Sequence, residues 1–143
     1  MIVVSKCLTG ECCRYDGASK PDAEIVELVK SGKAIALCPE QLGGLPTPRT
    51  PSELEASGEL VLDGKARAVT RCGRDVTKEF VRGAEEALRI VKECGAKEAI
   101  LKAKSPSCGA GLIYDGSFCG KLAPGDGVTA ALFKRNGISV SQR

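Results

Sequence analysis

Histidine is absent from this 143-residue chain, and its absence removes several large classes of catalytic site. Without an imidazole there is no Ser-His-Asp triad, no Cys-His pair and no zinc site with histidine ligands. General acid or base chemistry must therefore use the side chains of Glu, Asp, Lys, Tyr or Cys.

Aromatic residues are also scarce, and neither acidic nor basic residues are in large excess. Aromatic residues make up 3% of the chain and tryptophan is missing, so Val, Ile, Leu and Ala must build the core. So few rings exclude the aromatic platforms on which proteins stack single-stranded nucleic acid. The 21 basic and 18 acidic residues give a net charge of +3, with no Lys/Arg run that would indicate a polyanionic partner.

Long apolar runs are missing as well. No stretch approaches the ~20 apolar residues of a membrane span, and the apolar start at residues 2–4 is too short for a signal peptide. With 43% hydrophobic and 27% charged residues, the chain has the composition of a globular protein. We expect one domain over residues 1–143, in the cytoplasm and with no membrane partner.

Cysteine, by contrast, is abundant. The chain has eight, and in a reducing compartment clustered cysteines more often bind metal or act in catalysis than form disulfides. No C-x-x-C pair is present, which excludes a zinc ribbon, a thioredoxin-type redox pair and a ferredoxin run.

The apolar pattern predicts strands that alternate with helices. Strands are expected at 2–4, 34–37, 99–101 and 138–140. Helices are expected at 22–30, from Asp75 or Thr77 to about Cys94, and at 127–136 with Asp126 as cap. One hairpin is expected over residues 59–70, with its turn at Asp63-Gly64, and a second over residues 113–119. Residues 39–56 are expected to form a long loop. This order predicts an α/β three-layer sandwich, flavodoxin- or Rossmann-like, with a mostly parallel four-stranded sheet, helices on both faces and an inserted β-hairpin.

Three of the cysteines follow predicted strands. Cys7, Cys38 and Cys108 each lie beyond the carboxyl end of one strand, with separations of 31 and 70 positions. In open α/β sheets ligands bind at this edge, so the three thiols could meet in one crevice. Three thiolates without histidine suit an iron–sulfur cluster or a soft metal, and on a four-iron cluster they would leave one iron open. The alternative from spacing alone is that they are three small buried hydrophobic residues.

The neighbours of these cysteines favour a site. Each cysteine has polar and Gly or Pro neighbours, which let backbone N–H groups approach a cluster or an anion. Together with other segments they resemble the thiouracil desulfidase family of prokaryotic iron–sulfur proteins. The resemblance spans residues 2 to 140 and includes Cys7-Leu8-x-Gly10, Arg14-Tyr15-Asp16-Gly17, Pro39-Glu40 with Gly43-Gly44, Pro48-Arg49-x-Pro51, Gly73-Arg74-Asp75-Val76-Thr77, Ser105-Pro106-Ser107-Cys108-Gly109 and Gly125-x-Gly127-Val128-Thr129-Ala130-Ala131.

The resemblance implies a [4Fe-4S] cluster held by Cys7, Cys38 and Cys108, with the fourth iron free of protein ligands. It further implies hydrolytic, non-redox removal of sulfur from a thiolated pyrimidine such as 2-thiouracil, with the open iron binding the substrate sulfur. Such an exposed cluster is easily lost to oxygen, so aerobically purified protein can lack it. A small thiolated pyrimidine is the expected partner rather than nucleic acid, and the oligomeric state stays open.

Candidate roles follow for the residues around these ligands. Glu40, two residues past a ligand, is the expected base for the attacking water, and Ser105 is expected to position that water or the ring. The residues expected to bind substrate are Ser107, Asp16, Arg49 and Gly44. Each residue also has a structural alternative. Glu40 could be a solvated loop carboxylate, and both serines could be turn residues that hydrogen-bond to their own backbone. Asp16 could form an ion pair with Arg14, and Arg49 could hold its loop through contacts to the backbone.

Other readings of the sequence stay open at this point. The remaining cysteines, Cys12, Cys13, Cys72, Cys94 and Cys119, are not expected to be ligands. For the function, the alternatives are desulfuration of a thiolated nucleotide or of a thiolated base in RNA, or a non-catalytic iron–sulfur or zinc protein. Glu40→Gln separates the enzyme from the non-catalytic protein.

Overall fold

Four short apolar strands pair in parallel at the centre of the fold. The computed structural model describes residues 1–11, 15–17 and 21–143. Strands β1 (Ile2–Ser5), β2 (Ala34–Leu37), β5 (Glu98–Leu101) and β8 (Ser139–Gln142) form a sheet in the order β2-β1-β5-β8, with every neighbouring pair parallel. The predicted four-stranded parallel sheet is confirmed, with slightly different ends.

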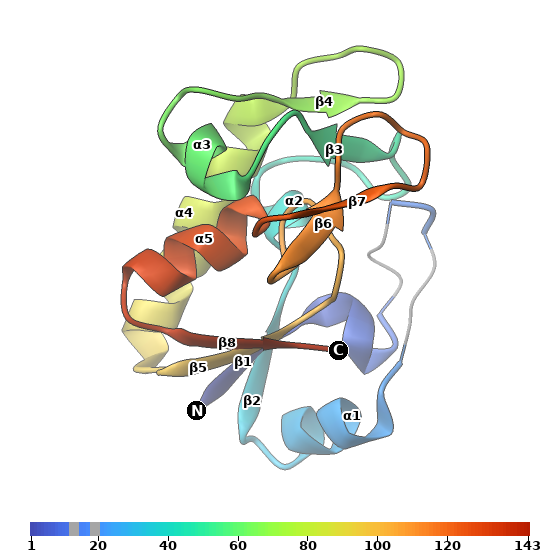
Figure 1. Cartoon of the computed structure of the whole chain (residues 1–143). Helices are drawn as coiled ribbons and strands as arrows, with labels where there is room; N and C mark the ends of the chain where they lie inside the picture. The colour runs from blue at the N-terminus through green and yellow to red at the C-terminus, as the bar shows by residue number, and fades with distance from the viewer. Residues whose placement is uncertain (12–14, 18–20) are drawn as a thin grey trace.

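Helices cover both faces of this sheet (Figure 1). Because successive strand residues point to opposite faces, Val4 packs against Ile25 of α1 (Ala23–Lys30), whereas Val3 belongs to the core on the other face. That second core contains α4 (Thr77–Cys94) and α5 (Val128–Arg135), with Phe133 fully buried. The three-layer α/β sandwich is therefore confirmed.

The helix ends match the sequence pattern in part. Asp22 caps α1 by accepting hydrogen bonds from the backbone N–H groups of Glu24 and Ile25. Asp126 does not cap α5, contrary to prediction: the capping position is Gly127, and Asp126 instead accepts from the Gly111 N–H and from Lys134. No helix in the described part of the chain is long and apolar enough to cross a membrane.

The first predicted hairpin was placed wrongly. Residues 59–62 belong to a helix, α3 (Gly58–Leu62), and the antiparallel pair is instead β3 (Ser52–Leu54) with β4 (Ala68–Thr70). The Ser57 hydroxyl accepts from the Leu60 N–H at the start of α3, and Val61 is buried. An apolar run this short does not distinguish a strand from a buried helical turn.

Two further segments differ from their predicted form. The predicted loop 39–56 begins with a helical turn, α2 (Pro39–Leu42), and ends in β3. The second hairpin pairs β6 (Leu112–Tyr114) with β7 (Leu122–Pro124), so its connection is the longer segment 115–121. The predicted Asp115-Gly116 turn does not close the hairpin, because the Gly116 N–H bonds to Glu53 on β3 instead. In Figure 1 these hairpins and α3 group above the carboxyl ends of the sheet strands.

Helix α2 lies directly on α4, and two glycines make this contact possible. A Cβ atom on Gly43 would lie 1.9 Å from the Glu79 carbonyl oxygen, and one on Gly83 would lie 1.9 Å from the Pro39 carbonyl oxygen. No side chain fits at either position without moving one helix away from the other. The contact therefore fixes the position of α2 over the edge of the sheet.

We predict that Gly83→Ala destabilises the protein by about 1–3 kcal/mol, the usual effect of overpacking. The same change at an ordinary helix position stabilises a protein by about 1 kcal/mol. The sign of the change in the free energy of unfolding therefore identifies the close contact. The free energy of unfolding from denaturant titration measures it. Glu85→Ala, on the exposed face of the same helix, is the control and is expected to change stability by less than about 0.5 kcal/mol. A more stable Gly83→Ala variant would contradict the prediction.

Candidate active site

A cavity of about 490 Å³ opens at the carboxyl ends of the parallel strands. One wall comes from the strand ends: residues 5–7, residues 37–40, residues 102–106 and Cys108. The opposite wall comes from the β3–β4 and β6–β7 hairpins, including Glu53, Arg71 and Phe118. This is the edge of an open α/β sheet where ligands bind.

All three cysteines predicted as ligands line this cavity. Cys7 lies in the short 3-10 helix η1 (Lys6–Thr9), Cys38 is the capping residue of α2, and Cys108 follows β5 in the 105–108 turn. Cys7 and Cys108 are buried and Cys38 is half-buried. The parallel topology thus brings together three thiols that are far apart in the sequence.

Burial dominates the electrostatics of Cys108. The pKa of its thiol is raised to about 12. Loss of solvent is the largest cause, the nearby Glu40 and Cys38 act in the same direction, and hydrogen bonds with Ser5 and Ser107 oppose them. The Ser5 hydroxyl is itself fixed, because it accepts a 2.8 Å hydrogen bond from the Lys102 N–H. Cys38, Cys108 and Glu40 are therefore close enough to influence one another.

The donor set fits an iron–sulfur cluster. Three thiols without a nitrogen ligand form a soft set, and a cationic metal centre supplies the charge that stabilises a buried thiolate. Among the residues that the structure describes, no three His, Cys, Asp or Glu side chains are arranged to hold a single metal ion. A cluster does not need such an arrangement, because each thiolate binds a different iron.

Glu40 faces the cavity as half of an ion pair. Its Oε2 accepts a 2.9 Å hydrogen bond from Nε of Arg49, and the two side chains are only 16% and 6% exposed. Arg49 also donates to Thr47 Oγ1 and to the Pro46 carbonyl. Arg49 thereby fixes both the orientation of the carboxylate and the 46–49 segment beside it.

Ser105 organises the turn that carries Cys108. Its Oγ accepts hydrogen bonds from the N–H groups of Ser107, at 3.1 Å, and Cys108, at 3.0 Å. A hydroxyl that accepts in this way keeps its own proton to donate. Ser105 lines the cavity, so that proton can serve a bound molecule or water.

Comparison with known proteins identifies the family of this site. The model of the 2-thiouracil desulfurase family matches residues 2–143. The chain belongs to this family. YbbK of Bacillus subtilis (strain 168) is 50% identical over 141 residues, which is 98% of this chain and 93% of YbbK. The solved structure of the [4Fe-4S]-dependent thiouracil desulfidase TudS superimposes with a TM-score of 0.88 at 47% identity, covering 99% of this chain and 89% of that one. The predicted resemblance is confirmed.

Not every predicted binding residue of this desulfurase-family chain reaches the cavity. Arg49 lines it, but Ser107 is 1% exposed and bonds to Thr129 Oγ1 at 2.8 Å, within the core under α5. Asp16 and Gly44 are exposed and are not among the lining residues. Arg14, and with it the predicted Arg14–Asp16 pair, lies outside the described residues, as do Cys12 and Cys13.

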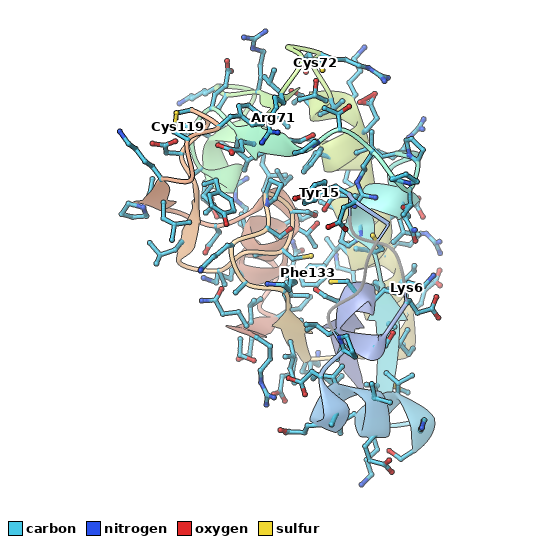
Figure 2. All side chains as sticks on the ribbon, turned by 90° about the vertical axis from the view of Figure 1, so that its right-hand side faces the viewer. Lys6, Tyr15, Arg71, Cys72, Cys119 and Phe133 are labelled. Atoms are coloured by element: carbon cyan, nitrogen blue, oxygen red, sulfur yellow. The ribbon has the colours of Figure 1, made fainter. Side chains whose placement is uncertain are left out.

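Three further cysteines lie among the described residues, and none of them lines the cavity. Cys94, near the end of α4, is half-buried and donates to the Val91 carbonyl. Cys72 and Cys119 are exposed, on loops at the top of the molecule in Figure 2. Their lack of a ligand role stays a prediction.

Four basic residues that the sequence reasoning did not single out also line the cavity: Lys6, Arg71, Lys102 and Lys104. Figure 2 shows Lys6 and Arg71 on either side of Tyr15. These cations come from η1, from the end of β4 and from the segment after β5. Because they come from three separate segments of the chain, no basic run in the sequence indicated the group.

Proposed function

We propose that this chain is a [4Fe-4S]-dependent desulfidase that hydrolyses the carbon–sulfur bond of a thiolated pyrimidine such as 2-thiouracil. The observation that carries the proposal is the meeting of three thiols and one carboxylate in a single cavity, in a chain of the 2-thiouracil desulfurase family. The name of the solved relative TudS supports both the cluster and the substrate.

Cys7, Cys38 and Cys108 would hold the cluster. When bound, it would supply one iron without a protein ligand, a soft Lewis acid suited to thiocarbonyl sulfur. A reducing cytoplasm would keep these three thiols available as ligands. Burial of Cys7 and Cys108 would help to exclude water and oxidants from two of the sulfur ligands.

Glu40 is the candidate base for the attacking water. Its carboxylate would take the water proton as the oxygen adds to the carbon that carries sulfur. Arg49 would hold the carboxylate in one orientation through the 2.9 Å contact. The Ser105 hydroxyl would donate its remaining proton in a hydrogen bond to the ring or the water. One C–O bond forms, one C–S bond breaks, and sulfur leaves as sulfide without any change in oxidation state.

We predict that reconstitution with iron and sulfide under anaerobic conditions yields about four iron and four acid-labile sulfide per chain. Cys7→Ser, Cys38→Ser and Cys108→Ser should each lose most of this content, because serine is a poor ligand for a soft centre. Cys94→Ser, outside the cavity, is the control and should retain it. Circular dichroism checks that each variant is folded. Full iron content in all three variants would contradict the assignment of the ligands.

We predict that Glu40→Gln keeps the cluster and lowers kcat for release of sulfide from 2-thiouracil by about 10²–10⁴-fold, the usual effect of losing a general base. Glu40→Asp, which keeps a carboxylate on a shorter stem, should retain more activity than Glu40→Gln. Iron content and the visible absorption of the cluster are measured alongside activity. Unchanged kcat in Glu40→Gln would remove Glu40 as the base and favour another proton acceptor. A fully loaded wild type without activity would favour the non-catalytic iron–sulfur alternative.

The basic residues of the cavity favour a second candidate substrate, a thiolated nucleotide. A free pyrimidine base carries no group that requires Lys6, Arg71, Lys102 and Lys104, whereas a phosphate on the same base would pair with them. These four cations are too few for a duplex or tRNA backbone, so a mononucleotide is a better match than RNA.

The nucleotide substrate predicts a higher kcat/KM for a thiolated uridine monophosphate than for the free thiolated base. It also predicts that Lys104→Ala lowers kcat/KM for the nucleotide about tenfold and leaves the free base within twofold, because only the phosphate gains from the cation. Steady-state assays of both substrates at two salt concentrations measure this difference. Equal kcat/KM values for both substrates would contradict recognition of a phosphate by these cations, and a higher value for the free base would remove the nucleotide as the substrate.

A further inference from the structure

The few aromatic residues of the chain are divided between the core and the cavity. Tyrosine and phenylalanine together number five, and tryptophan is absent. Phe80 and Phe133 are at most 1% exposed in the core. The other three, Tyr15, Tyr114 and Phe118, all line the cavity. Every ring that does not build the core is therefore at the site.

Phe118 is distinguished from the two tyrosines by its backbone. Its φ is 57°, in the left-handed region that is unfavourable for a bulky side chain. Among the described residues, Phe118 and Lys104 are the two non-glycine residues with positive φ, and both line the cavity. Outliers of this kind gather at functional sites, where the surrounding structure holds them in place.

Neighbouring residues hold this backbone from two sides. Glu53 Oε1 accepts hydrogen bonds from the N–H groups of Gly116, at 2.9 Å, and Phe118, at 3.1 Å. Gly116 presses against β3 so closely that a Cβ atom there would lie 2.7 Å from the Leu54 carbonyl oxygen. The segment 115–121 is thus fixed on β3 before any ligand arrives.

The ring of Phe118 is held as well. The Arg71 guanidinium carbon lies over it, 5.9 Å from the ring centroid. This distance is that of a cation–π contact. Arg71 therefore covers one face of this half-buried ring, and a flat ligand that stacks on the ring would use the other face.

From this arrangement we propose that Phe118 is a substrate-binding residue whose ring stacks on the pyrimidine ring. The proposal rests on the proposed function for the chemical class of the ligand. A thiolated pyrimidine is flat and has a π face, and stacking on an aromatic side chain needs no particular substituent. Because Glu53, Gly116 and Arg71 fix the ring in advance, binding costs little loss of side-chain freedom. Phe118 would align the ring plane while Ser105 and Glu40 act at its edge.

The test compares Phe118→Leu, which keeps apolar bulk without a π face, with Phe118→Tyr, which keeps the ring. In the reconstituted enzyme, Phe118→Leu should raise KM for 2-thiouracil about tenfold, leave kcat within about twofold and keep the iron content. Phe118→Tyr should stay near the wild type. Tyr114→Leu, at a cavity aromatic with an ordinary backbone, is the matched control and should change KM less. A normal KM in Phe118→Leu, or the larger effect in Tyr114→Leu, would overturn the proposal.

A binding measurement separates this proposal from the reaction itself. Uracil has the same ring but no sulfur to release, and its dissociation constant for the reconstituted protein follows from equilibrium dialysis. Phe118→Leu should also raise the dissociation constant for uracil about tenfold. A wild type that binds uracil through Phe118 but releases no sulfide would refute the proposed function and leave the stacking role standing. A wild type that binds neither ligand would refute the stacking role.

A second variant covers the case in which Phe118→Leu does not fold. Glu53→Ala removes the acceptor that holds the Phe118 N–H and should raise KM in the same direction. If both variants fold, the double variant should be no worse than the poorer single one, since both changes act through one ring. Additive losses in KM would overturn the coupling of Glu53 to Phe118.

Discussion

The site depends on how closely α2 approaches α4. Gly43 and Gly83 let the backbone of α2 lie against α4 at a distance that admits no Cβ atom at either position. Since Cys38 is the capping residue of α2 and Glu40 lies in its first turn, this contact sets where a thiol and a carboxylate stand over the sheet. A helix of four residues has little intrinsic stability, so tertiary packing must hold it in place. The positions of Cys38 and Glu40 therefore depend on α4, an eighteen-residue helix that contributes no residue to the lining of the cavity.

The same architecture explains why the three thiols converge. β1 lies between β2 and β5 and is parallel to both, so the segments that leave these strands emerge at one edge of the sheet. Cys7 and Cys38 follow their strands closely, whereas Cys108 needs the longer 102–108 segment. Ser105 folds that segment into a turn by accepting two N–H groups, and Ser107 anchors it to Thr129 under α5. Two serines separated by one residue thus have different roles: Ser105 faces the cavity and Ser107 faces the core.

Local sequence pattern predicted the strands and the near wall of the cavity, and it failed where distant segments decide. Continuous apolar runs mark buried parallel strands, so 2–4 and 34–37 were predictable, and with them the neighbouring Cys7 and Cys38. The run at 59–62 has the same appearance but packs as a helix against α5, which no local period reveals. The far wall depends on Glu53 reaching Gly116 and Phe118, residues more than sixty positions away. The direction of Ser107 depends likewise on Thr129.

The residues around the cavity break several rules that the rest of the chain obeys. The site holds buried thiols, a half-buried Glu40–Arg49 pair, a phenylalanine in the left-handed region and a group of cations. An ion pair removed from water contributes little net stability. A phenylalanine with left-handed backbone dihedral angles costs free energy on folding. Such features persist where the surrounding structure over-determines them, and here the α2–α4 contact and the Glu53 bonds do so. These unfavourable features all lie around one cavity, and close backbone contacts and hydrogen bonds support them. That distribution is expected of a site whose geometry is fixed before its ligand arrives.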